Sequence, residues 1–93
     1  MDYYTMKEEK VVIPNKLGLH ARAAAVFSRQ ASAFISDVQV IKDSMEVNGK
    51  SIMELLTLAA TKGSDITIKA HGDDETQALE TLAELVKQGF GES

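Results

Sequence analysis

The setting of His20 suits covalent chemistry on a phosphoryl group. This histidine lies in residues 15–24, where a strand pattern changes to a helix pattern. Histidine is a poor helix-capping residue, so several amide N–H groups at the helix start should lack a side-chain acceptor. Those amides and the guanidinium of Arg22 would together bind a phosphate. The same positive groups disfavour a protonated ring, which leaves neutral imidazole as a nucleophile that can attack phosphorus.

The residues before His20 fit a loop that another protein approaches. Gly18 permits a positive φ and close approach of a partner's backbone. Leu17 and Leu19 are apolar loop residues that suit a docking rim, although Leu19 could equally pack as the hydrophobic staple of the helix. From the residues alone, we expect a phosphohistidine at His20, held by backbone amides and Arg22.

Apolar periodicity predicts the element order β-α-β-β-α-β-α. Strands are expected at about residues 6–13, 38–41, 45–48 and 65–70. Helices are expected from 21 to about 34, from 52 to about 59, and from about 74 to 89. Because each strand has one polar face and each long helix one apolar stripe, the fold class is α+β, a two-layer sandwich with helices over one face of a four-stranded sheet.

Local signals refine these elements. The spacing of Ser51 and Glu54 predicts a reciprocal capping box, and Asp74 offers a weaker cap to the last helix. The acidic residues of that helix, Glu75 among them, are expected to be solvated. Met45 is expected in the core and His71 in a solvated loop, without a role.

Composition limits the classes of function. A chain of 93 residues with 44% hydrophobic residues predicts a single domain, residues 1–93, with one core. The net charge of −4 disfavours nucleic-acid binding. Without cysteine there are no disulfides or thiolate sites, and no carboxylate pair has a metal-binding spacing, so no metal or cofactor is expected. No apolar run approaches a membrane span and no secretory signal is evident, so we expect a cytoplasmic protein without membrane insertion.

Two segments carry a resemblance to a known family. Leu17-Gly18-Leu19-His20-Ala21-Arg22, followed by an alanine-rich helix and then by Val47-Asn48-Gly49-Lys50-Ser51-Ile52-Met53, resembles HPr, the histidine-containing phosphocarrier of the bacterial phosphotransferase system. The resemblance covers nearly the whole chain. It implies an open-faced sandwich with an antiparallel sheet of order 1-4-2-3, preceded by a frayed extension at residues 1–5.

The resemblance also implies a function. His20 would take a phosphoryl group on Nδ1 from phosphorylated enzyme I, itself charged by phosphoenolpyruvate, and pass it to an enzyme IIA domain of the sugar phosphotransferase system. Arg22 would neutralise the phosphoryl oxygens. The protein would be a carrier rather than an enzyme. Its oligomeric state stays open, with a monomer favoured by its size and by transient docking. The implied docking residues are Leu17, Gly18, Leu19, Ala21, Ala23, Ala24, Lys50, Ile52 and Met53.

Ser51 is implied to be a regulatory site for an ATP-dependent HPr kinase/phosphorylase, although its capping role alone would explain it. Two departures from the family pattern bear on the site. Ala23 stands where proline is common, and Glu54, where many regulated members have a small residue, would repel a phosphate on Ser51. Three alternatives stay open: the nitrogen-related regulatory branch, a small α+β ligand-sensing module, and a regulator that acts only through phosphorylated Ser51.

Overall fold

The computed structural model describes residues 7–92 and contains the predicted order of elements. The strands are β1 (Lys7–Val12), β2 (Asp37–Lys42), β3 (Met45–Asn48) and β4 (Asp65–His71). The helices are α1 (Ala21–Ser32), α2 (Ile52–Thr57) and α3 (Glu75–Lys87), followed by a short 3₁₀ turn, η1 (Gly89–Gly91). Residues 1–5, for which fraying was expected, lie outside the described range.

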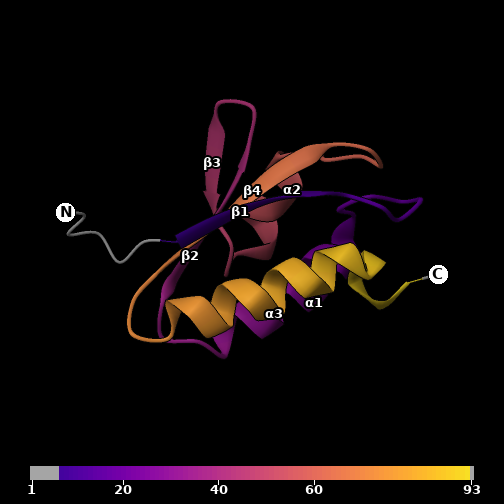
Figure 1. Ribbon diagram of the computed structural model, residues 1–93. Coiled ribbons are helices and arrows are strands. Elements are labelled where there is room, and N and C mark those ends of the chain that lie inside the picture. Colours follow the sequence, from indigo (N-terminus) through magenta and orange to yellow (C-terminus); the bar gives the residue numbers. More distant parts are fainter. Residues whose placement is uncertain (1–6, 93) are drawn as a thin grey trace.

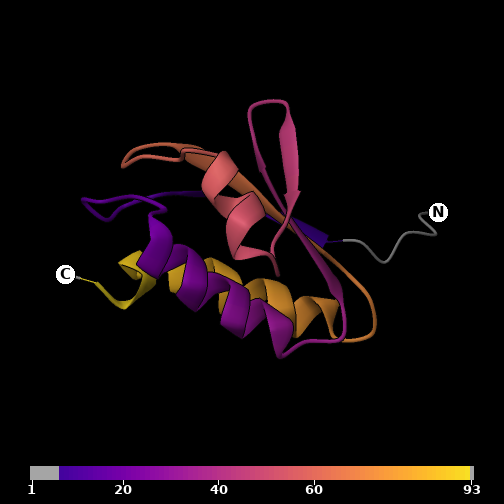
Figure 2. The same ribbon diagram turned by 180° about the vertical axis from the view of Figure 1, so that it is seen from behind.

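The four strands form one antiparallel sheet in the order β1-β4-β2-β3, which confirms the expected order. On β4, Ile66, Ile68 and Ala70 all face the helices and are buried, as their alternation predicted. The neighbouring strand β2 adds Val38 and Val40, paired with Ala70 and Ile68. The helices cover this one face, with α1 and α3 lying side by side (Figure 1 and Figure 2).

Helix α1 ends two residues earlier than its apolar pattern predicted. The N–H groups of Ala33 and Phe34 bond to carbonyls three residues back, which tightens the last turn. The next two N–H groups, those of Ile35 and Ser36, donate to the carboxylate of Asp74 at 2.9 and 3.0 Å. The chain therefore leaves the helix, and Ile35 is left 78% exposed.

The predicted capping interactions were only half right. Ser51 Oγ accepts from Glu54 N at 3.2 Å, but the Glu54 carboxylate accepts from Asn48 N rather than from Ser51 N. The Glu54 carboxylate can bond to Asn48 N instead because Ser51 N already donates to the Asn48 carbonyl and needs no second acceptor. Asp74 does not cap α3, since its carboxylate is bonded to the residues that follow α1.

Three further expectations were wrong. Glu75 is buried, and it accepts a hydrogen bond from Gly72 N instead of lying on a solvated face. Met45 is 47% exposed because it lies at the tip of the β2–β3 hairpin rather than in the core. His71 is the last residue of β4, paired with Asp37, and not a loop residue. No helix within residues 7–92 is long and apolar enough to cross a membrane.

Candidate functional site

His20 occupies the N-cap position of α1. Its backbone is extended, with φ −83° and ψ −178°, and its carbonyl accepts the hydrogen bond from Ala24 N that begins the helix. Within the described residues its side chain makes no capping bond, so the first-turn amides keep the uncapped state predicted from the sequence. The side chain is 24% exposed, so the ring lies at the surface of the site.

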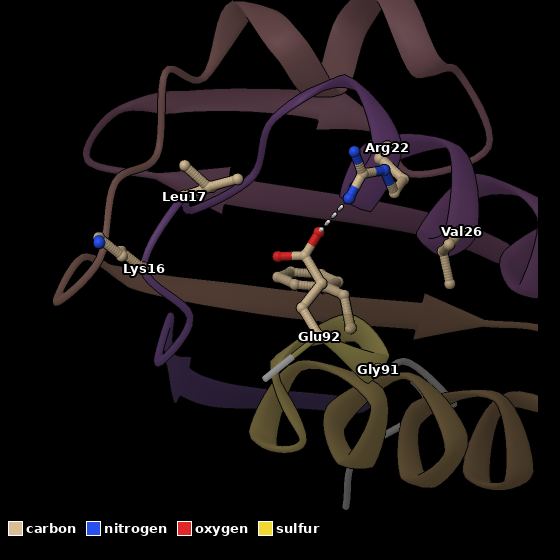
Figure 3. A pocket seen from close by; sticks show the side chains of 7 residues that line it. Lys16, Leu17, Arg22, Val26, Gly91 and Glu92 are labelled. Atoms are coloured by element: carbon tan, nitrogen blue, oxygen red, sulfur yellow. Dashed lines mark ion pairs between the residues drawn. The ribbon is translucent and has the colours of Figure 1, made fainter.

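A carboxylate that the sequence analysis missed contacts the ring. Oε2 of Glu92 lies 2.5 Å from Nε2 of His20 and 3.9 Å from a guanidinium nitrogen of Arg22. Figure 3 shows the ion pair between Glu92 and Arg22 at the edge of a pocket whose wall also includes Lys16 and Leu17. The sequence analysis named the positive helix start and Arg22 beside His20, and the structure adds an anion against the ring.

Asn15 holds this carboxylate in place. Its side-chain amide is buried and donates to Oε1 of Glu92 and to the carbonyl of Gly18, both at 2.9 Å. The hydrogen bond from Asn15 lowers the pKa of Glu92 below its usual value, and His20 and Arg22 lower it further, against partial desolvation that raises it. Glu92 is therefore ionised at neutral pH.

The turn η1 brings Glu92 to His20 from the far end of the sequence. Gly89, Phe90 and Gly91 have φ values of +67°, +59° and +82°, so three consecutive residues are left-handed. For Phe90 this conformation costs about 1 to 2 kcal/mol, and burial of its ring offsets that cost, because Phe90 is only 4% exposed. Two glycines flanking one aromatic residue are the sequence signal that could have located this turn.

Gly18 has the positive φ that was predicted, at +67°. The structure shows a close approach at Gly18 that the sequence analysis did not expect, to a segment of this chain. A Cβ at Gly18 would lie 2.5 Å from the carbonyl oxygen of Ala60, which accepts a hydrogen bond from Leu19 N. The glycine thus lets the His20 loop pack on the segment that follows α2.

Comparison with known proteins identifies the family. The family model described as the PTS HPr component phosphorylation site matches residues 7–88. The chain belongs to the HPr family. The phosphocarrier protein HPr of Neisseria meningitidis is 48% identical over 87 residues, which cover 94% of this chain and 98% of the relative. The HPr-like protein Crh of Bacillus subtilis is 47% identical over 83 residues, 89% of this chain and 98% of Crh.

The fold agrees with this assignment. The crystal structure of HPr-C-His from Thermoanaerobacter tengcongensis superimposes with a TM-score of 0.90 at 45% identity, covering 94% of this chain and 98% of that chain. Sequence and fold together support a phosphocarrier role in the phosphotransferase system, as the HPr resemblance implied.

Seven of the nine docking residues expected from the HPr resemblance divide into an exposed and a buried group, while Gly18 is buried and Lys50 is partly exposed. Leu17, Ile52 and Met53 are 62%, 41% and 76% exposed, and Ala21 is exposed beside His20. By contrast, three expected docking side chains lie in the core and are at most 5% exposed: Leu19, Ala23 and Ala24. Their burial does not fit contact with a partner. They support the loop and α1 from beneath, which for Leu19 agrees with the staple interpretation.

Ser51 and His20 are the N-cap residues of two different helices. Ser51 is the N-cap of α2, and the neighbouring Lys50 donates from Nζ to the carbonyl of Phe34 at 2.8 Å, just past the C-terminal end of α1. His20 begins α1 at the opposite end of that helix. The structure thus brings together His20 and Arg22 of the predicted site at the start of α1, whereas Ser51 begins a different helix, α2.

Proposed function

We propose that this HPr accepts a phosphoryl group on Nδ1 of His20 from phosphorylated enzyme I and passes it to an enzyme IIA domain. The observation that carries the proposal is the contact between Glu92 and Nε2 of His20, at 2.5 Å. Because Nε2 is engaged by a carboxylate, Nδ1 is the nitrogen left for a phosphoryl donor. The partly exposed ring lies at an uncapped helix start, with Arg22 near enough to meet an incoming anion.

The transfer requires little chemistry from the carrier. The Nδ1 lone pair of the neutral ring forms a bond to phosphorus while the bond between phosphorus and the donor breaks. Arg22 and the first-turn amides of α1 stabilise the negative charge on the transferred group. The reverse step at an enzyme IIA domain returns His20 to its starting state.

Labelling tests this proposal directly. Incubation with enzyme I and phosphoenolpyruvate should add one acid-labile phosphate to the wild type and none to His20→Ala. The His71→Ala variant is the matched control, because it removes the second histidine and should be labelled normally. Label retained in His20→Ala would contradict the proposal that His20 is the phosphorylated residue.

Regulation at Ser51 is a second proposal. Ser51 is partly exposed at the start of α2, next to the exposed side chains of Ile52 and Met53. A phosphate would add about −1.5 to −2 charges there and would disfavour docking of an acidic or apolar partner surface. ATP and an HPr kinase/phosphorylase should label the wild type but not Ser51→Ala. Label retained in that variant would place the modification elsewhere.

The pathway and the assembly state belong to the same proposal. We expect a cytoplasmic monomer that serves the sugar branch, with the nitrogen-related branch as the alternative. Transfer rates to enzyme IIA proteins of the two kinds separate the branches.

A related HPr from T. tengcongensis has been crystallised as a dimer, so sedimentation at several concentrations should check the monomer. Melting temperatures test the remaining alternative. A small ligand-sensing module should melt at a higher temperature when its metabolite is added, whereas a phosphocarrier should show no such shift with small molecules.

A further inference from the structure

We infer that Glu92 is a positioning residue for phosphoryl transfer at His20, an inference that rests on the proposed function. Its carboxylate would hold the Nε2–H of the ring in place and would balance the positive charge that the ring acquires once Nδ1 carries the phosphoryl group. The HPr resemblance assigns neither task to a side chain at this position.

The contacts define which ring nitrogen carries the proton. Oε2 of Glu92 is 2.5 Å from Nε2 of His20, and an ionised carboxylate can only accept a hydrogen bond. Nε2 must therefore donate, and in the neutral ring the lone pair lies on Nδ1. Arg22 also lies near this pair, at 3.9 Å from the same carboxylate oxygen, and Lys16 lines the same pocket.

Asn15 sets the orientation of the carboxylate. The two protons of its amide nitrogen go to the Gly18 carbonyl and to Oε1 of Glu92, so the amide orientation is defined by two acceptors. With Oε1 held by a buried donor, Oε2 is directed at the imidazole. The chain of contacts Asn15, Glu92, His20 follows a general arrangement in which an orienting group fixes the tautomer of a reactive histidine.

The charge balance of the transfer explains why a carboxylate helps. When Nδ1 of the neutral ring attacks phosphorus, the donor leaves with the electron pair of its own bond, and no proton is released. The ring keeps its Nε2–H and gains one positive charge. Glu92 lies against that N–H, so it stabilises the phosphorylated ring more than the free neutral ring. Its effect therefore falls on the transfer step itself.

Removal of the carboxylate tests the inference. In Glu92→Ala we expect phosphorylation by enzyme I to slow about tenfold, as for the loss of one charge-assisted hydrogen bond in a partly exposed site. The matched control is Glu80→Ala, which removes an equal charge from an exposed position on α3 and should leave the rate unchanged. In proton NMR spectra of the unphosphorylated protein, the wild type and the control should show a hydrogen-bonded Nε2 proton, and Glu92→Ala should not.

Glu92→Gln gives a second, sharper readout. A glutamine has one accepting oxygen, and the amide of Asn15 requires it. The NH₂ group would then face Nε2 and favour the tautomer with the proton on Nδ1, which removes the nucleophilic lone pair. We expect nitrogen-15 chemical shifts to show a larger fraction of that tautomer than in the wild type, with phosphorylation at least as slow as in Glu92→Ala.

The outcomes separate this inference from the proposed function. If the wild type takes up no phosphate on His20, the proposed function fails, whatever the variants do. If His20 is labelled and Glu92→Ala is as fast as Glu80→Ala, the positioning role is overturned and the carrier function stands. A slow Glu92→Ala that keeps the Nε2 proton signal would also overturn it, because the loss would then come from elsewhere in the structure.

Discussion

The carboxylate of Asp74 accepts hydrogen bonds from both the backbone N–H and the hydroxyl of Ser36, although 38 residues separate them. It also accepts from Ile35 N at 2.9 Å. One side chain at the start of α3 thus joins the turn after α1 to the turn after β4. The hydrogen bond from Ser36 and then that from Ile35 lower the pKa of Asp74, against a smaller effect of desolvation.

This lowered pKa predicts a pH dependence of stability. A carboxyl group whose pKa is lower in the folded state stabilises the protein fully above its unfolded pKa, here 3.8. That contribution is lost as the pH falls below this value towards the folded pKa. We expect Asp74→Asn to lower the melting temperature at pH 7 and to flatten the dependence on pH below 4. Thermal scans from pH 2 to 7 measure both, and a variant with the wild-type slope would contradict the assignment.

The capping bond at Ser51 can be separated from its proposed regulation. Ser51→Ala removes the acceptor for Glu54 N and should cost about 1 kcal/mol of unfolding free energy, equivalent to about 4 to 8 °C in melting temperature for a domain of this size. Ser51→Asp keeps a capping acceptor and adds a charge. We expect slower transfer to His20 in the aspartate variant alone. Equal transfer rates in both variants would argue against regulation through charge.

Exposed apolar side chains give a test of docking. Met53 is 76% exposed, so Met53→Ala should change the stability by no more than about 0.5 kcal/mol. If it is a contact residue, its loss should weaken the complex with enzyme I about tenfold, measured by titration calorimetry. The control is Ile35→Ala, because Ile35 is 78% exposed beyond the opposite end of α1 from His20. Equal binding by both variants would move the docking surface away from Met53.

Two glycines with left-handed backbones predict very different costs of substitution. Gly63 has φ +90° with open space around it. Gly63→Ala should therefore lower the free energy of unfolding only by the cost of a left-handed backbone, about 1 to 2 kcal/mol. Gly18→Ala adds a clash, because its Cβ would lie 2.5 Å from the carbonyl oxygen of Ala60. This substitution should lower the free energy of unfolding by about 3 kcal/mol or more. Urea denaturation measures both values. Similar costs at the two positions would mean that the loop shifts away from Ala60.

The sheet and the start of α1 were predictable because their signals are local. Ile66, Ile68 and Ala70 alternate within six residues, and an alternating pattern can bury one face whatever the remaining chain does. The position of His20 at a helix start likewise depends only on its neighbours. The order of the strands was expected from the family resemblance, since alternation alone leaves the order open.

The contacts that complete the site were not predictable in this way. Glu92 meets His20 across 72 residues, and only the folded chain shows that α3 ends beside the start of α1. The same limit applies to Leu17 and Leu19, two apolar residues in one loop. Leu19 is buried because its N–H bonds to Ala60 and turns its side chain inward, whereas Leu17 is left 62% exposed.

The left-handed turn at Gly89–Gly91 has a practical consequence for handling the protein. An affinity tag fused after Ser93 would begin two residues beyond Glu92, whose carboxylate contacts His20. A tag there would crowd the ring and could pull Glu92 away from it. The first residue of β1, Lys7, pairs with Ala70 at the other end of the sheet from the His20 loop, so a fusion joined ahead of it is the safer design.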